Sequence, residues 1–275
     1  MLRLFRDRLL VSLAPDAVSW VRLTRGVRPR VSAKRALAVD PDYGAEPWSG
    51  AVAALAREAE QWRRERLAVT VVLSNHFVRY TAVPPPARST SAKEALALAR
   101  FHFSKVHGER AAAWDVRFSP ASAGASLASA TDISLLEAIK ACFEPRGKAR
   151  LVSIQPYTMA AFNFWRGRID RHGAWLLLVE PGTACVALLA GKKWASVQNV
   201  KSGYASDKWP ALLDREKHRI SVEDMPRTVL TRCAAPVSSA LGARKDWHFV
   251  MLDPPSLPGV ATDELESYAM ALHAA

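Results

Sequence analysis

Residues 9–23 read LLVSLAPDAVSWVRL, and much the same arrangement returns at residues 175–190 as WLLLVEPGTACVALLA. In both stretches an apolar, strand-like run meets a short turn that contains proline, and a second strand-like run follows. Each then passes a glycine and enters a third such run, at residues 31–39 and 194–200. Two meanders of this kind predict two similar half-folds in one chain. Two unrelated meanders are the alternative.

The segments that follow each meander favour duplication. After the first come a helical pattern at residues 51–66 and a strand rich in β-branched residues at 67–73. After the second come a helical pattern at 208–218 and strand-like runs at 228–233 and 247–252. A βββαβ unit used twice is the layout of the actin-like (ribonuclease H-like) superfold. The sequence therefore predicts a duplicated, bilobal α/β fold of the actin-like type.

The middle of the chain reads as a separate piece, because prolines 84–86 interrupt the first half. A helix is predicted at residues 92–107, and a second helix is predicted to start after Thr131 or Asp132. The predicted buried faces are Leu96, Ala99, Phe103 and Val106 in the first helix, and Ile133, Leu136, Ile139 and Phe143 in the second.

These patterns divide the chain into three parts. Residues 1–86 and 151–172 are expected to form the first actin-like lobe, with a C-terminal helix at 263–275 packed on it. Residues 87–150 are expected to form an α/β subdomain inserted into that lobe, and residues 173–262 the second lobe.

The chain has 275 residues and a formal net charge of +12, and its first 35 residues hold nine basic and two acidic side chains. Such asymmetry is typical of a face that meets nucleic acid, anionic lipid headgroups or an acidic partner. Arginine richness spread over solvated faces is the other interpretation. Nucleic acid ranks third, since no zinc finger, helix-turn-helix or basic-aromatic strand pair is present.

The sequence contains no motif typical of metal-binding proteins, of common hydrolases, of P-loop proteins or of membrane-spanning proteins. The three cysteines are far apart and form no ligand cluster with histidine, so neither a disulfide framework nor a metal site is expected. No GxSxG, HExxH or P-loop pattern is present, and no catalytic residue is predicted. The apolar run at residues 9–13 is too short for a signal peptide, and the window 174–190 is broken by Glu180, Pro181 and Gly182. A soluble protein is expected.

The order of elements resembles a known group. The resemblance is carried by the following stretches: VTVVLSNHFVRYTAVPPP (69–86), LASATDISLLEAIKACF (127–143), ARLVSIQPYTMAAFNFW (149–165), WLLLVEPGTACVALLAGKKWASV (175–197) and SYAMALHAA (267–275). Together they resemble the PilM/GspL group of actin-like proteins from type IV pilus, MSHA-type pilus and type II secretion inner-membrane platforms. The resemblance implies a cytoplasmic scaffold, peripheral at the inner membrane through its partners, which include a membrane-anchored platform protein. Homo-oligomers are also possible.

The nucleotide site of such folds is eroded in this sequence. Actin-like sites use an acidic residue and glycine in each turn, and PilM-like proteins that bind ATP resemble DIGSxxxK at the first turn. Here Ser12 replaces the acid, Ala14 replaces the glycine, and Pro15 removes a backbone donor before Asp16. Trp20 stands near the place of the lysine. The second turn keeps Glu180, Gly182 and Thr183. We expect vestigial phosphate turns, no ATPase activity and no cofactor.

The resemblance also implies a partner surface, because in PilM-like proteins a short peptide lies against the first lobe and the insertion. The matching residues are Arg79, Tyr80, Arg100, Phe101 and Lys105. The arginines would meet acidic side chains or carbonyl groups, and the aromatic rings would be apolar anchors. Tyr80 and Phe101 have an alternative role as packing between lobe and insertion.

Three functions therefore stay open after the sequence alone. The chain is a non-catalytic platform scaffold, an ATP-binding switch with the same fold, or a basic module that binds nucleic acid or anionic lipid.

Overall fold

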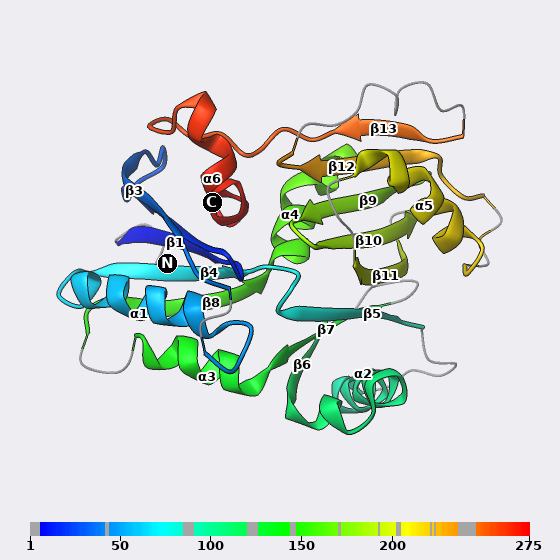
Figure 1. Cartoon of the computed structure of the whole chain (residues 1–275), viewed down its shortest axis with the longest axis horizontal. Coiled ribbons are helices and arrows are strands. Elements are labelled where there is room, and N and C mark those ends of the chain that lie inside the picture. Colours follow the sequence, from blue (N-terminus) through cyan, green and yellow to red (C-terminus); the bar gives the residue numbers. More distant parts are fainter. Residues whose placement is uncertain are drawn as a thin grey trace. The chain divides into compact units, whose positions relative to one another are not determined.

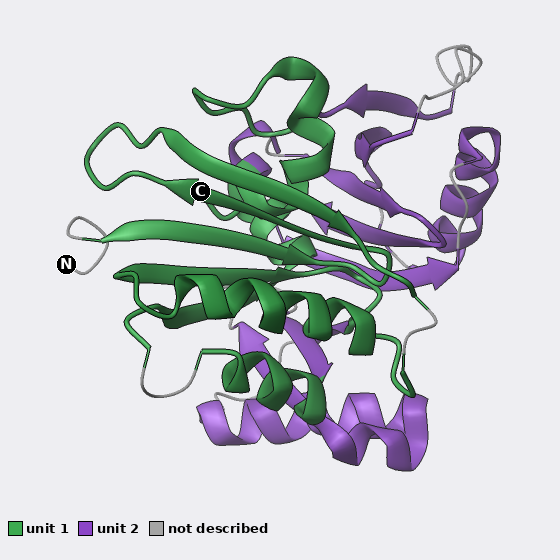
Figure 2. Cartoon of the chain, turned by 60° about the vertical axis from the view of Figure 1, so that its left-hand side comes forward, with its two compact units in different colours: residues 1–78, 132–164, 254–275 green, residues 79–131, 165–253 purple. Residues whose placement is uncertain are grey.

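The computed structural model describes residues 6–41, 44–84, 91–119, 126–143, 147–169, 172–191, 193–201, 205–220, 222, 224–235 and 246–275. The chain divides into two compact units (Figure 2). Unit 1 comprises Met1–Val78, Asp132–Phe164 and Pro254–Ala275, and unit 2 comprises Arg79–Thr131 and Trp165–Asp253. Contacts thus group much of the expected insertion with the second actin-like sheet. The three-part division expected from the sequence stays a prediction.

Unit 1 is built on a five-stranded sheet in the order β3-β2-β1-β4-β8. Its strands are β1 (Asp7–Leu13), β2 (Ala17–Leu23), β3 (Val31–Ala38), β4 (Leu67–Leu73) and β8 (Arg150–Pro156). The first three strands form the antiparallel meander, and β4 and β8 run parallel to β1. Every residue of β4 is buried, which fits an apolar, β-branched strand at the centre of a parallel arrangement.

Helices cover both faces of this sheet (Figure 1). Because successive side chains of a strand point to opposite faces, Trp20 contacts α1 (Ser49–Trp62) while Val21 packs with α6 (Leu265–Leu272). The α6 segment is also held by polar contacts: Arg8 Nη2 donates to the carbonyl oxygen of Ala274 at 2.6 Å, and Lys34 pairs with Glu264. The C-terminal helix is therefore an integral part of the unit 1 core.

The helix α3 (Ile133–Ala141) packs against α1, and β8 leads into α4 (Tyr157–Trp165). The buried residues of α3 are Leu135 and Ile139, whereas Ile133 is 40% exposed. The face predicted from the sequence was therefore wrong at Ile133. The reason is that α3 packs on α1, and this contact buries Leu135 and leaves Ile133 exposed.

Unit 2 contains a second five-stranded sheet in the order β11-β10-β9-β12-β13. Its strands are β9 (Gly173–Glu180), β10 (Thr183–Ala190), β11 (Lys193–Lys201), β12 (Thr228–Cys233) and β13 (His248–Met251). Again a three-stranded antiparallel meander is extended by two parallel strands, and α5 (Trp209–Lys217) packs on one face. The same order and direction in both sheets confirm the duplicated actin-like fold.

A smaller three-stranded sheet, β5-β7-β6, also lies in the middle of the chain. It consists of β5 (Val78–Val83), β6 (Trp114–Ser119) and β7 (Ser126–Asp132), and α2 (Ala92–His107) packs on it. Ala99 and Phe103 are buried there as predicted, but Val106 is 74% exposed. His107 continues the buried face instead, since its ring lies 4.9 Å from that of Trp114.

Candidate functional site

The first phosphate turn, at Ser12 to Asp16, is closed by its own hydrogen bonds. The Oγ atoms of Ser12 and Ser19 lie 2.7 Å apart across the hairpin, and both residues are buried. The N–H of Ala14 donates to the carbonyl oxygen of Ala17 at 2.9 Å, and Pro15 has no N–H. The side chain at position 12 thus bonds inside unit 1, and this turn offers few free donors to a phosphate group.

Trp20, near the place of the lysine in the ATP-binding pattern, has a packing role. Its indole N–H donates to Glu58 Oε2 at 2.8 Å, and its ring meets that of Trp62 edge-on with centroids 5.4 Å apart. Glu58 is 4% exposed and also accepts from Arg35 at 2.8 Å. The Trp20 side chain therefore holds α1 against the sheet of unit 1.

The second phosphate turn, in unit 2, is a two-residue hairpin loop. Glu180 and Thr183 are paired directly across β9 and β10, and both are buried. Pro181 and Gly182 form the exposed turn between them, and Gly182 has a φ of 77°, which only glycine adopts readily. Thr183 Oγ1 donates to the carbonyl oxygen of Val200 at 3.3 Å. The acid and the glycine are thus present, while the threonine hydroxyl bonds to a neighbouring strand.

No group of three or more His, Cys, Asp or Glu side chains that could hold a metal ion occurs among the described residues. Within the same ranges, no helix is long and apolar enough to cross a membrane.

The predicted partner residues are brought together only in part. Arg100, Phe101 and Lys105 are all exposed on α2, and Phe101 is 60% exposed. The start of this helix is fixed by a capping box: Ser91 Oγ accepts from the N–H of Glu94, and Glu94 accepts from the N–H of Ser91. The Glu94 carboxylate accepts hydrogen bonds from both the N–H and the hydroxyl of Ser91, and these two bonds lower the pKa of that carboxyl.

Arg79 and Tyr80 are neighbours on β5 and point to opposite faces of the small sheet. Arg79 is exposed and lies on the face that α2 covers, where burial lowers the pKa of His107 and the charge of Arg79 lowers it further. Tyr80 is only 7% exposed. Phe101 is therefore the exposed aromatic side chain of the predicted set.

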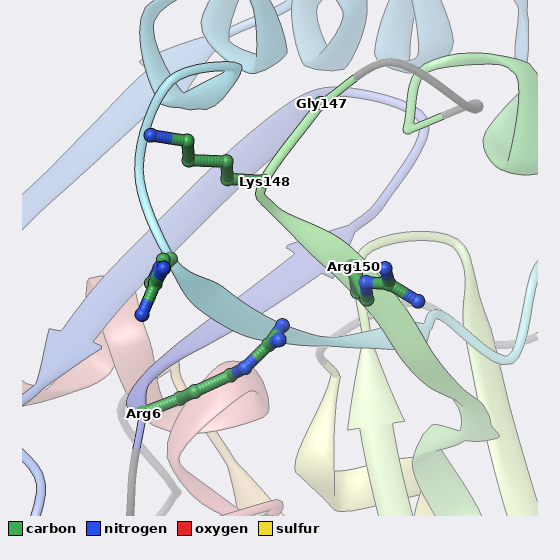
Figure 3. A pocket seen from close by; sticks show the side chains of 5 residues that line it. Arg6, Gly147, Lys148 and Arg150 are labelled. Carbon is green, nitrogen blue, oxygen red and sulfur yellow. The ribbon is translucent and has the colours of Figure 1, made fainter.

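The sequence reading missed a pocket in unit 1 of about 360 Å³, lined by Arg6, Arg66, Gly147, Lys148 and Arg150 (Figure 3). The basic residues come from the starts of β1, β4 and β8, which are far apart in the sequence. The surplus of basic residues near the N-terminus was the available signal. Parallel pairing of β1, β4 and β8 gathers them at one edge of the sheet, and such long-range pairing leaves no local mark in the sequence.

Comparison with solved structures places this fold among known ones. A chain of a PilM–PilN type IV pilus biogenesis complex is similar with a TM-score of 0.70 and 16% identity, over 97% of this chain and 96% of that one. A Bacteroides thetaiotaomicron protein with an actin-like ATPase fold and unknown function has a TM-score of 0.61 and 10% identity, over 90% and 91%. The cytoplasmic domain of EpsL, an inner-membrane component of the Vibrio cholerae type II secretion system, has a TM-score of 0.55 and 12% identity, over 96% and 94%.

No protein-family model matches the sequence, and the curated proteins gave no match either. The chain therefore has the actin-like fold of the PilM and EpsL structures, and the resemblance predicted from the sequence is confirmed at the level of the fold.

Proposed function

We propose that this chain is a cytoplasmic scaffold of a type IV pilus or type II secretion inner-membrane platform, and that it binds the cytoplasmic peptide of a membrane-anchored partner. The observation that carries the proposal is the likeness to a PilM–PilN chain over 97% of the sequence. An alignment of that length includes α2 and its small sheet as well as the two repeated sheets. The scaffold would be peripheral at the inner membrane through this partner.

The exposed side of α2 has the chemistry of a peptide-binding surface. Phe101 offers a large apolar side chain to solvent, and Arg100 and Lys105 flank it with positive charge. An exposed aromatic residue beside basic groups suits a peptide with an apolar residue next to acidic ones. Arg79, on the α2-covered face of the small sheet, can add to the positive charge near the C-terminal end of the helix.

The first prediction tests this surface. A Phe101→Ala, Arg100→Glu double variant should bind the partner's cytoplasmic peptide at least tenfold more weakly, because it removes the apolar anchor and repels acidic residues. Titration of labelled cytoplasmic peptides from membrane proteins encoded beside this gene would measure the change. Arg57→Glu, an exposed helical position of α1, is the matched control and should bind as the unmodified chain does. Equal affinity of the double variant and the control would rule out α2 as the binding surface.

We further propose that the scaffold does not hydrolyse ATP. The support comes from the first turn, where Ser12 is bonded to Ser19, Pro15 lacks a donor, and Trp20 is committed to Glu58. A turn with no carboxylate at the metal position and few free N–H groups is poorly suited to hold a hydrated metal and phosphates. The second turn alone, with Glu180 and Gly182, would have to supply them.

The second prediction is that 5 mM Mg-ATP leaves the melting temperature of the chain unchanged within about 1 °C. A nucleotide present at a hundred times its Kd would add about 2.7 kcal/mol and raise the melting temperature by roughly 5 °C or more. Phosphate release should equal that of a Glu180→Ala variant. A clear thermal shift would favour the ATP-binding switch, and release above that variant would show an enzyme.

A further inference from the structure

We propose that unit 1 carries a phosphate-binding edge that docks on the headgroups of an anionic membrane. It consists of the pocket lined by Arg6, Arg66, Lys148 and Arg150, together with the apolar tip of the β2–β3 turn at Val27. The proposal does not rest on the peptide-binding function, since all of these residues lie in unit 1 and the α2 surface lies in unit 2.

The topology of unit 1 gathers positive charge at one edge of its sheet. Asp7 pairs with Leu67 and Ala68 with Arg150 in parallel register, so β1, β4 and β8 begin side by side. Arg6 directly precedes β1, Arg66 directly precedes β4, and Arg150 is the first residue of β8. Lys148 is held there because its N–H donates to the carbonyl oxygen of Arg63 at 2.8 Å. Figure 3 shows Arg6, Lys148 and Arg150, which line the pocket.

The same edge includes the turn between β2 and β3, because Leu23 is paired with Arg8 on one side and with Val31 on the other. The four segments that meet here are residues 6–8, 22–31, 63–68 and 147–150. Together they contain eleven basic and two acidic side chains. The edge therefore concentrates much of the net charge of the whole chain.

The two acidic side chains at this edge are already engaged by one arginine. Arg22 Nη2 lies 2.8 Å from Asp7 Oδ2, and Arg22 also pairs with Glu65. In the described part of the chain, none of the four basic side chains of the pocket forms a salt bridge. Their charge is therefore available to an external anion, and three of the four residues are exposed.

The choice of ligand follows from the surroundings of the pocket. Sites for small molecules are mostly apolar, whereas this lining is basic apart from Gly147. A broad, exposed cationic edge suits a surface of many phosphates. Val27 is 91% exposed between Arg25 and Arg28, and an aliphatic tip beside arginines gains free energy in the acyl boundary of a membrane. The four segments contain no aromatic residue on which nucleic-acid bases could stack.

The test is sedimentation of the full chain with vesicles of phosphatidylcholine alone or with 30% phosphatidylglycerol. We expect binding only to the anionic vesicles, with an affinity that falls as salt is raised from about 50 to 300 mM. An Arg6→Glu, Lys148→Glu, Arg150→Glu variant should bind roughly a hundredfold more weakly, at about fivefold for each basic side chain lost. Val27→Ser should produce a smaller loss, about twofold to fivefold.

The matched control is an Arg110→Glu, Lys208→Glu, Arg227→Glu variant, which changes the same charge at exposed positions of unit 2. It should keep most of the vesicle binding. A glutamine version of the unit 1 variant and circular dichroism of every protein distinguish lost binding from lost folding.

Three results would overturn the proposal. One is equal binding to neutral and anionic vesicles, and another is equal loss in the unit 1 and unit 2 variants. The third is tighter binding of the unmodified chain to pyrophosphate or to duplex DNA than to anionic vesicles, with loss in the unit 1 variant. That result would assign the edge to a soluble phosphate or to nucleic acid.

Discussion

Gly173→Ala should destabilise the chain by about 3–5 kcal/mol, because the added methyl group meets both an unfavourable φ and the backbone of the neighbouring strand. Gly173 begins β9 with a φ of +94°, which side-chain-bearing residues rarely adopt. A Cβ placed there would lie 1.9 Å from the carbonyl oxygen of Leu189 and 2.8 Å from its carbonyl carbon. Both atoms are backbone of the paired strand β10, so the sheet itself would have to move.

Urea unfolding of the variant and of a matched control measures this cost. Gly167→Ala adds the same methyl group where no heavy atom lies within 4 Å and φ is not positive. The control should stay within about 0.5–1 kcal/mol of the unmodified chain. If the two alanine variants unfold at the same urea concentration, the approach of β10 to Gly173 is not as close as described.

Trp20→Ala should destabilise unit 1 by about 3–5 kcal/mol, the range for large aromatic side chains removed from a core. The change deletes the edge-on contact with Trp62 and the hydrogen bond to Glu58. Glu58, 4% exposed, would then keep only its bond to Arg35, whose side chain is 51% exposed. A buried carboxylate that loses one of two partners adds to the cost of the cavity.

Two further substitutions separate these contributions. Trp20→Phe keeps an aromatic ring and loses the indole donor, so it should cost less, about 1–2 kcal/mol. Trp20→Lys places a lysine near the position at which the ATP-binding pattern has one, and we expect it to destabilise the chain without a thermal shift from Mg-ATP. Nucleotide binding by the lysine variant would show that Trp20 alone blocks the site. A cost below 1 kcal/mol for the alanine variant would contradict the packing role.

The elements that the sequence predicted best are those whose pattern is local. The repeated meanders and β4 were predicted within two residues of their ends, because apolar strands between proline and glycine turns carry their own signal. The helix faces were less predictable, since a face depends on what it packs against. Val106 is exposed to solvent, because it is the ring of His107 that packs against the ring of Trp114 on β6.

In the candidate sites too, features with a local sequence pattern could be predicted, and features that depend on contacts between distant segments could not. The serine at position 12, where the resemblance leads us to expect an acid, is visible in the sequence, but the bond of Ser12 to Ser19 depends on the register of β1 and β2. Tyr80 and Arg79 are adjacent in the sequence and were predicted to share a surface, which the alternation of side chains along β5 prevents. The basic pocket required parallel pairing between strands more than 80 residues apart, and no local pattern reports that.

The discontinuous make-up of unit 1 sets an order for its completion during synthesis. Chains fold as they leave the ribosome, N-terminal segments first. Leu10 and Val21 emerge early, yet their covering residues, Tyr268 and Leu272, belong to α6. The second sheet, from residues 173–251, is translated in between. A nascent chain that already contains both five-stranded sheets still exposes one apolar face of the unit 1 sheet to solvent. That face is buried only when α6 has been synthesised and packs on it. A ribosome stalled before residue 265 should therefore present a chaperone substrate.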